Sequence, residues 1–185
     1  MPRQVDERME HGLDIQTPLS DEQIVQCRAG REVRISGVVY AARDQAHKRL
    51  CRALEAGDPL PIDLAGQVIY FVGPTPAPRG RVIGAAGPTT AARMDAFSPR
   101  LVQAGLKGMI GKGCRGPAVR QALQDYRAVH FAAIGGAGAL LSRHITAAEV
   151  VAYDDLGTEA IRRLVFEDFP AIVAYDAYGG SVYDR

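Results

Sequence analysis

The stretch "VIGAAGPTTAARMDAF", residues 82–97, places two threonines and an arginine where an apolar run gives way to a helical pattern. Arg93 follows Thr89 by four residues. The start of a helix leaves backbone N–H groups unpaired and carries the positive end of the helix dipole, so this junction favours an anion. A simpler alternative is that Thr89 or Thr90 caps the helix and that Arg93 is a solvated surface charge.

Two more cations stand at comparable junctions. Arg43 follows the strand-like run "EVRISGVVYAA", and Lys112 lies in "MIGKG" after another apolar run. Because ligands gather beyond the strand ends of open α/β sheets, Arg43, Arg93 and Lys112 could converge on one anion. Guanidinium forks suit carboxylates and an ammonium adds a compact charge, so the set favours a substrate with more than one carboxylate. For each cation taken singly, a solvated surface position is the commoner role.

The elements that must position these residues alternate between strand and helix patterns. Residues 32–42 alternate apolar and polar side chains, which predicts a strand with Gly37 as a bulge. Over residues 43–56 the apolar spacing becomes helical, and a glycine ends that helix. Continuous apolar runs predict further strands at 63–73 and 81–87, the second after a stiff proline-rich loop.

The later segments continue this alternation. Ser98 and Pro99 suit the N-cap and first position of a helix, and Pro117 suits the start of the next one. The pattern predicts a layered α/β fold in a single domain over residues 17–185. The polar residues 1–16 are expected to form a flexible N-terminal arm.

The totals bound the class of protein. The chain has 185 residues, 47% of them hydrophobic, and a net charge of +1, which gives no overall footprint for nucleic acid or an anionic membrane. No apolar run approaches a membrane span and the first residues lack the apolar core of a secretory signal, which predicts a cytoplasmic protein. Cys27, Cys51 and Cys114 show neither CxxC nor His spacing, so neither a disulfide framework nor a zinc site is expected.

Other features have two interpretations. The glycine-rich "GMIGKG" and "AIGGAGALL" resemble phosphate loops but match neither a Walker loop nor a dinucleotide fingerprint. Asp44 and His47 could orient Arg43, or be a helix cap and a surface residue. Glu159 is either a first-turn carboxylate or a buried partner of one of the cations. The sequence favours the plainer roles for His47 and Glu159.

Six motifs in fixed order carry a family resemblance: "YAARDQAHKRL", "YFVGPTPAP", "GPTTAARMD", "GMIGKG", "AAIGGAGALL" and "EAIRRLVFEDFPAIV". Together they resemble the β-subunit, or C-terminal domain, of class I fumarate hydratases and the related tartrate dehydratases. The resemblance runs from about Thr17 onward. It implies a three-layer swivelling β/β/α domain.

The resemblance also implies half of an enzyme. In this family a partner α-subunit or N-terminal domain supplies three cysteines that hold a [4Fe-4S] cluster, whose open iron acts as a Lewis acid on the substrate. Cys27, Cys51 and Cys114 lie outside the family's ligand positions, so no cluster is assigned to this chain. The resemblance further suggests an α2β2 heterotetramer.

Carried over by position, Arg43, Arg93 and Lys112 match the family's substrate-binding residues, and Thr89 matches the residue proposed to move the C3 proton. One departure is Ala92, where the family usually has glycine. The expected reaction is reversible hydration of fumarate to (S)-malate, with tartrate or mesaconate as alternative substrates. A non-catalytic anion- or nucleotide-binding module is the alternative from another class.

Overall fold

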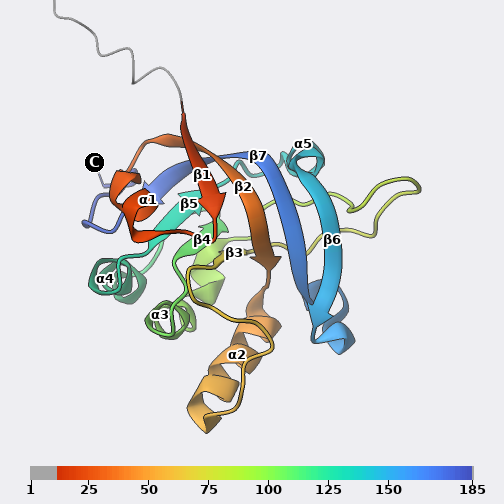
Figure 1. Cartoon of the computed structure of the whole chain (residues 1–185), viewed down its shortest axis with the longest axis horizontal. Coiled ribbons are helices and arrows are strands. Elements are labelled where there is room, and N and C mark those ends of the chain that lie inside the picture. The colour runs from red at the N-terminus through yellow and green to blue at the C-terminus, as the bar shows by residue number, and fades with distance from the viewer. Residues whose placement is uncertain (1–11, 185) are drawn as a thin grey trace, which may run out of the picture.

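A computed structural model describes residues 12–184 as a mixed α/β fold around a seven-stranded sheet (Figure 1). The strands are β1 (Leu13–Thr17), β2 (Glu32–Ala41), β3 (Val68–Tyr70), β4 (Gly108–Gly111), β5 (Val129–Ala132), β6 (Ile145–Ala152) and β7 (Ile161–Tyr175). The α-helices are α1 (Asp21–Gln26), α2 (Asp44–Ala56), α3 (Ser98–Gln103), α4 (Pro117–Asp125) and α5 (Gly138–Leu141). The 3-10 helices are η2 (Ala91–Met94), η3 (Ser142–His144) and η4 (Asp154–Glu159). The predicted α/β class is confirmed.

The sheet has the strand order β1-β2-β3-β4-β5-β7-β6. Strands β1 to β5 run parallel, whereas β7 is antiparallel to its neighbours β2, β5 and β6. Since β7 pairs with both β2 and β5, it closes β2, β3, β4, β5 and β7 into a ring. The carboxyl ends of β2 to β5 therefore all reach the same edge of the sheet.

Both faces of the central strands are buried. Ile69 and Met109 pack in a core that the helices α2, α3 and α4 cover, and Figure 1 shows these three helices together on one side of the sheet. Tyr70 and Ile110, the next residues along the same strands, pack in a second core with residues of β2, β6 and β7. Because both faces of these short strands are buried, their sequences are continuous apolar runs rather than alternating patterns.

Several predicted local features are confirmed. Gly57 ends α2 in the left-handed conformation, with φ of 73°. The β2–β7 register shifts between Ile35 and Gly37, which is the predicted bulge. Pro117 is the first residue of α4.

Other predictions need correction. Leu13–Thr17 form β1, paired in parallel with β2, so the residues of the predicted arm from Leu13 onward belong to the folded domain. Residues 1–11 of that arm lie outside the described residues. Ser98 is the first residue of α3 rather than its N-cap, which is Phe97. The Ser98 hydroxyl does not cap the helix but donates to the Met94 carbonyl of the preceding turn at 2.9 Å.

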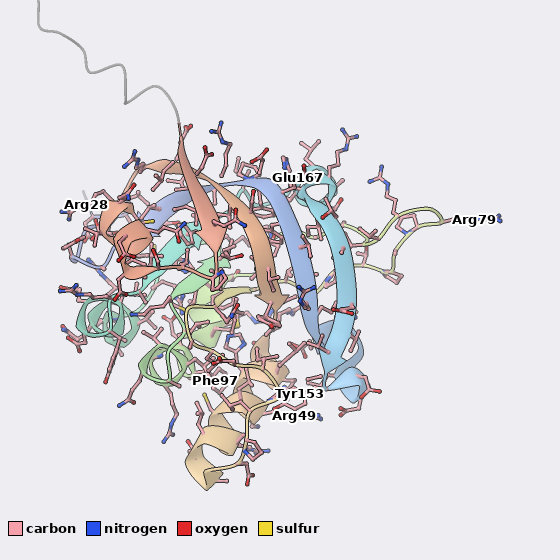
Figure 2. The ribbon with its side chains drawn as sticks, in the orientation of Figure 1. Arg28, Arg49, Arg79, Phe97, Tyr153 and Glu167 are labelled. Atoms are coloured by element: carbon pink, nitrogen blue, oxygen red, sulfur yellow. The ribbon has the colours of Figure 1, made fainter. Side chains whose placement is uncertain are left out.

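Residues 81–87 form no strand, contrary to the prediction. They are the returning limb of a proline-rich loop that extends beyond β6 in Figure 1, with Arg79 at its outer end in Figure 2. Two hydrogen bonds between Thr75 and Ala85 close the base of this loop, at 3.1 and 2.8 Å. A Cβ on Gly84 would lie 2.2 Å from the Thr75 carbonyl oxygen, so glycine permits this close approach.

Candidate active site

Arg43 lies two residues after the end of β2, at the N-cap of α2, which is the strand-to-helix junction that the sequence predicted. Its side chain packs against Gly73, which lies three residues after the end of β3. A Cβ on Gly73 would lie only 2.5 Å from Arg43 Nη1, so the glycine makes room for the guanidinium. Arg43 Nε lies 3.8 Å from Glu159 Oε1 and 3.9 Å from Asp44 Oδ2, and makes no hydrogen bond within the described chain.

Asp44 joins two of the predicted cations. Its Oδ1 accepts a hydrogen bond from Arg93 Nε at 3.0 Å, while its Oδ2 faces Arg43. Arg93 lies in η2, and half of its side chain is exposed. The structure therefore brings Arg43 and Arg93 to one carboxylate, and leaves the Arg93 guanidinium accessible to a ligand.

Thr89 and Lys112 are adjacent through their backbones. The Thr89 N–H donates to the Phe71 carbonyl at 2.7 Å, and the Lys112 N–H donates to the Thr89 carbonyl at 3.2 Å. The Ala91 N–H returns a bond to the Lys112 carbonyl at 2.8 Å. Thr89 is thus fixed between the ends of β3 and β4, with η2 beginning two residues later.

Thr90 occupies the N-cap position of η2, but its side chain makes no capping hydrogen bond. The capping interpretation is therefore correct for the position of Thr90 and wrong for its side chain. Thr90 is exposed, whereas Thr89 is partly buried, so the two threonines have different surroundings.

The glycine-rich turn after β5 also reaches this edge. A Cβ on Gly135 would lie 3.3 Å from Lys112 Cδ, and the Ala86 N–H donates to the Gly138 carbonyl at 3.0 Å. The turn packs beside Lys112 and the threonine segment. Its glycines permit close packing, and α5, which follows, is only four residues long.

His47 lies beneath the site and is completely buried, so its prediction as a surface residue is wrong. It falls three residues before Leu50 and four before Cys51, on the face of α2 that packs against the sheet. Its Nδ1 bonds to the Arg43 carbonyl at 2.8 Å, and its ring meets Phe71 edge-on at 5.3 Å. Burial lowers the pKa of His47 to about 4, which keeps the ring neutral.

Glu159 is a partner of Arg43, so the plainer role favoured from the sequence is wrong. It ends η4, which lies against α2. Arg49 on α2 forms a two-point ion pair with Asp155 of η4. The Arg49 guanidinium also lies over the Tyr153 ring, 5.1 Å from its centre, and Figure 2 labels these two residues side by side. These contacts hold Glu159 beside the N-terminal end of α2.

The arrangement favours an anionic ligand. Arg43, Arg93 and Lys112 carry three positive charges, and Asp44 and Glu159 carry two negative ones, so one positive charge is in excess. Two of the cations are held by carboxylates at the edge of the site, which orders them before a ligand arrives. A guanidinium can then bind a carboxylate with two parallel hydrogen bonds.

The cysteines do not approach one another as a ligand set. Cys27 and Cys51 are buried in different cores, and Cys114 is exposed. Within residues 12–184, no group of three or more His, Cys, Asp or Glu side chains is placed to hold a metal ion. In the same part of the chain, no helix has the length and apolar character needed to cross a membrane.

A family model described as "Fumarase C-terminus" matches residues 1–185. The chain belongs to this family. It is 33% identical over 177 residues to "Fumarate hydratase class I, aerobic" of Salmonella typhimurium, covering 94% of this chain and 30% of that protein. It is 38% identical over 154 residues to "Fumarate hydratase 1, mitochondrial" of Leishmania major, covering 82% of this chain and 28% of that protein.

A third member of the comparison differs in length. A Methanocaldococcus jannaschii protein named as subunit beta of an L(+)-tartrate dehydratase is 33% identical over 173 residues, covering 90% of this chain and 89% of that protein. This chain thus spans about a third of the length of the two fumarate hydratases and most of the length of the subunit beta. The predicted family membership is confirmed.

Proposed function

We propose that this chain is the β-subunit of a two-subunit hydro-lyase that reversibly hydrates fumarate to (S)-malate. The observation that carries the proposal is the meeting of Arg43 and Arg93 at Asp44, beside the backbone-paired Thr89 and Lys112. Membership of the fumarase C-terminus family and the names of the relatives support the hydro-lyase class. The near full-length match to a subunit beta supports the subunit role.

In this proposal the cations bind the two carboxylates of the substrate. Lys112 is joined to Thr89 through the backbone and Arg93 follows Thr89 by four residues, while Asp44 of α2 and Glu159 of η4 lie beside Arg43. Such charge-assisted hydrogen bonds are each worth about 1.5–3 kcal/mol. Binding at both ends would fix the carbon skeleton relative to the Thr89 hydroxyl.

Thr89 Oγ1 is the proposed acceptor of the C3 proton in the dehydration direction, and it returns that proton in hydration. An aliphatic hydroxyl is too weakly acidic to ionise at neutral pH without help. Nearby cations favour the ionised form, and removal of water strengthens their effect. Arg43, Arg93 and Lys112 are the groups of this chain that could supply this stabilisation.

The [4Fe-4S] cluster implied by the resemblance does not fit residues 12–184, because their cysteines are separated and no three-ligand group is present. We therefore assign the cluster to a partner α-subunit, in an α2β2 assembly.

We also propose that the helices, the parallel strands and the β2–β7–β6 strands are the three layers of a swivelling β/β/α domain. L(+)-tartrate is the second candidate substrate, because the tartrate dehydratase relative has nearly the length of this chain.

The test is an anaerobic assay of this chain with its α-subunit on fumarate, mesaconate and tartrate. Arg43→Met, Arg93→Met and Lys112→Met should each lower kcat/KM by about one to two orders of magnitude. Arg100→Met is the matched control, since Arg100 pairs with Glu55 on the surface between α2 and α3. Kinetics near wild type for all three site variants would refute the convergent-cation site.

A further inference from the structure

Arg115 is the buried arginine of the described chain, and its side chain has no exposed surface. Its Nε donates to Asp95 Oδ1 at 2.7 Å and its Nη2 donates to Ser98 Oγ at 2.6 Å. Nη1 lies 3.1 Å from His130 Nδ1. All three guanidinium nitrogens are thus engaged inside the chain, so Arg115 cannot reach a substrate.

The bonds of Arg115 end on the turn that carries Arg93. Asp95 directly follows η2, and its second oxygen accepts the Gly116 N–H at 2.6 Å. Ser98 links Arg115 to η2, because its hydroxyl accepts from Arg115 and donates to the carbonyl of Met94, the last residue of η2. Arg115 is therefore bound to this turn at two points, through the ion pair with Asp95 and through the hydrogen bond to the Ser98 hydroxyl.

The two segments joined in this way are those that carry the candidate site. Lys112 precedes Arg115 by three residues, and Arg93 precedes Asp95 by two. At the other end of the same segments, the Thr89–Lys112 and Ala91–Lys112 backbone bonds make the only β-bridge that joins them within residues 12–184. This bridge fixes one end of the two segments, and the contacts of Arg115 and Gly116 with Asp95 and Ser98 fix the other end.

We propose that Arg115 and Asp95 are positioning residues that fix the η2 turn, with Arg93, against the segment carrying Lys112. The proposal rests on the proposed function for the identity of the ligand, while the attachment of the two segments can be tested without any ligand. Enclosure makes the pair effective, because solvent cannot compete for the guanidinium as it does at surface pairs.

The first experiment measures amide hydrogen exchange by NMR on the full chain. Arg115→Lys keeps the charge, but an ammonium lacks the planar fork that holds Asp95, Ser98 and His130 together. The Ala91 and Lys112 amides should exchange at least about tenfold faster, while amides of the β2–β7 pairing stay unchanged. Ser98→Ala removes one attachment and keeps the ion pair, so it should give a smaller increase of about threefold. Arg100→Lys is the surface control and should change neither amide.

The second experiment measures steady-state kinetics of the same variants with the α-subunit. A positioning role predicts a KM for the dicarboxylate about tenfold higher in Arg115→Lys. A purely structural role would lower the amount of folded enzyme, and hence the apparent kcat, without changing KM. An unchanged KM in folded Arg115→Lys, or unchanged exchange at Ala91 and Lys112, overturns the proposal. If the wild-type pair turns over no dicarboxylate, the proposed function fails, whereas the exchange comparison still decides the positioning role.

Discussion

Acidification should destabilise this fold through His47. The ring is fully buried, and burial lowers its pKa from 6.5 to about 4 in the folded chain. Between these values the unfolded chain binds a proton at His47 and the folded chain does not, so the free energy of unfolding falls as pH falls. The stabilisation is complete above pH 6.5 and is lost as the pH approaches 4.

The magnitude follows from the two pKa values. Going from pH 7 to pH 4.5 should cost about 2 kcal/mol through His47 alone. Burial also lowers the pKa of His130, so a second buried ring acts in the same direction. Urea denaturation at both pH values, on wild type and His47→Gln, isolates the His47 contribution because His130 and the carboxylates are common to both.

The wild type should lose about 2 kcal/mol more than His47→Gln over this interval. The imidazole signals of folded wild type, followed by NMR, provide a check that does not depend on the stability of the variant. An equal loss in both proteins, or a His47 ring that titrates near 6.5 while the chain is folded, would refute the reasoning.

Three further predictions concern the site, the fold and the cofactor. Gly73→Ala should raise the KM for a dicarboxylate about tenfold in steady-state kinetics with little change in Tm, because its methyl would displace the Arg43 guanidinium. Asp176→Asn should lower the free energy of unfolding by about 2 kcal/mol in urea titrations, because the carboxylate accepts three backbone N–H groups at 2.8 to 3.0 Å. The chain purified without a partner should contain no stoichiometric iron or sulfide by elemental analysis; finding both would contradict the assignment of the cluster to the α-subunit.

The sequence predicted the main positions of the site because they depend on local patterns. A strand period that changes to a helix period places Arg43 at the N-cap of α2, where the structure has it. The same reasoning places Lys112 after β4, and parallel strands carry such ends to one edge. Thr89 was placed after a strand at 81–87 that does not form, and it reaches this edge through its backbone hydrogen bonds to Phe71 and Lys112. The roles of these residues remain predictions.

The sequence did not reveal the groups that hold the site together. Asp95 and Arg115 are ordinary charges in a linear sequence, and only the folded chain shows that Arg115 is enclosed. One signal was present: each follows a candidate cation by two or three residues, and their charges are opposite. His47 was missed because an amphipathic pattern treats histidine as polar, although it falls on the buried face of α2.

The strand expected at 81–87 failed for a different reason. The run is apolar, which is typical of a buried strand, but its backbone bonds at Ala85 and Ala86 go to Thr75 and Gly138 rather than to the backbone of a neighbouring strand, and the Ala86 carbonyl accepts the Tyr70 hydroxyl. The apolar composition therefore correctly indicated that residues near the base of the loop are buried, but it wrongly predicted that they form a strand. The contact between Gly84 and Thr75 joins the two limbs of a loop, and the periodicity of either limb alone cannot predict it.

The most direct test of the central claim compares the two neighbouring threonines. The measurement is exchange of the malate C3 proton with solvent deuterium, followed by NMR on the αβ enzyme with iron content matched. Thr89→Ala should abolish nearly all exchange, and Thr89→Ser should keep part of it because the hydroxyl remains. Thr90→Ala should exchange close to the wild-type rate, since Thr90 is exposed and makes no capping hydrogen bond. Normal exchange in Thr89→Ala would contradict the account, and would place the proton acceptor outside this segment.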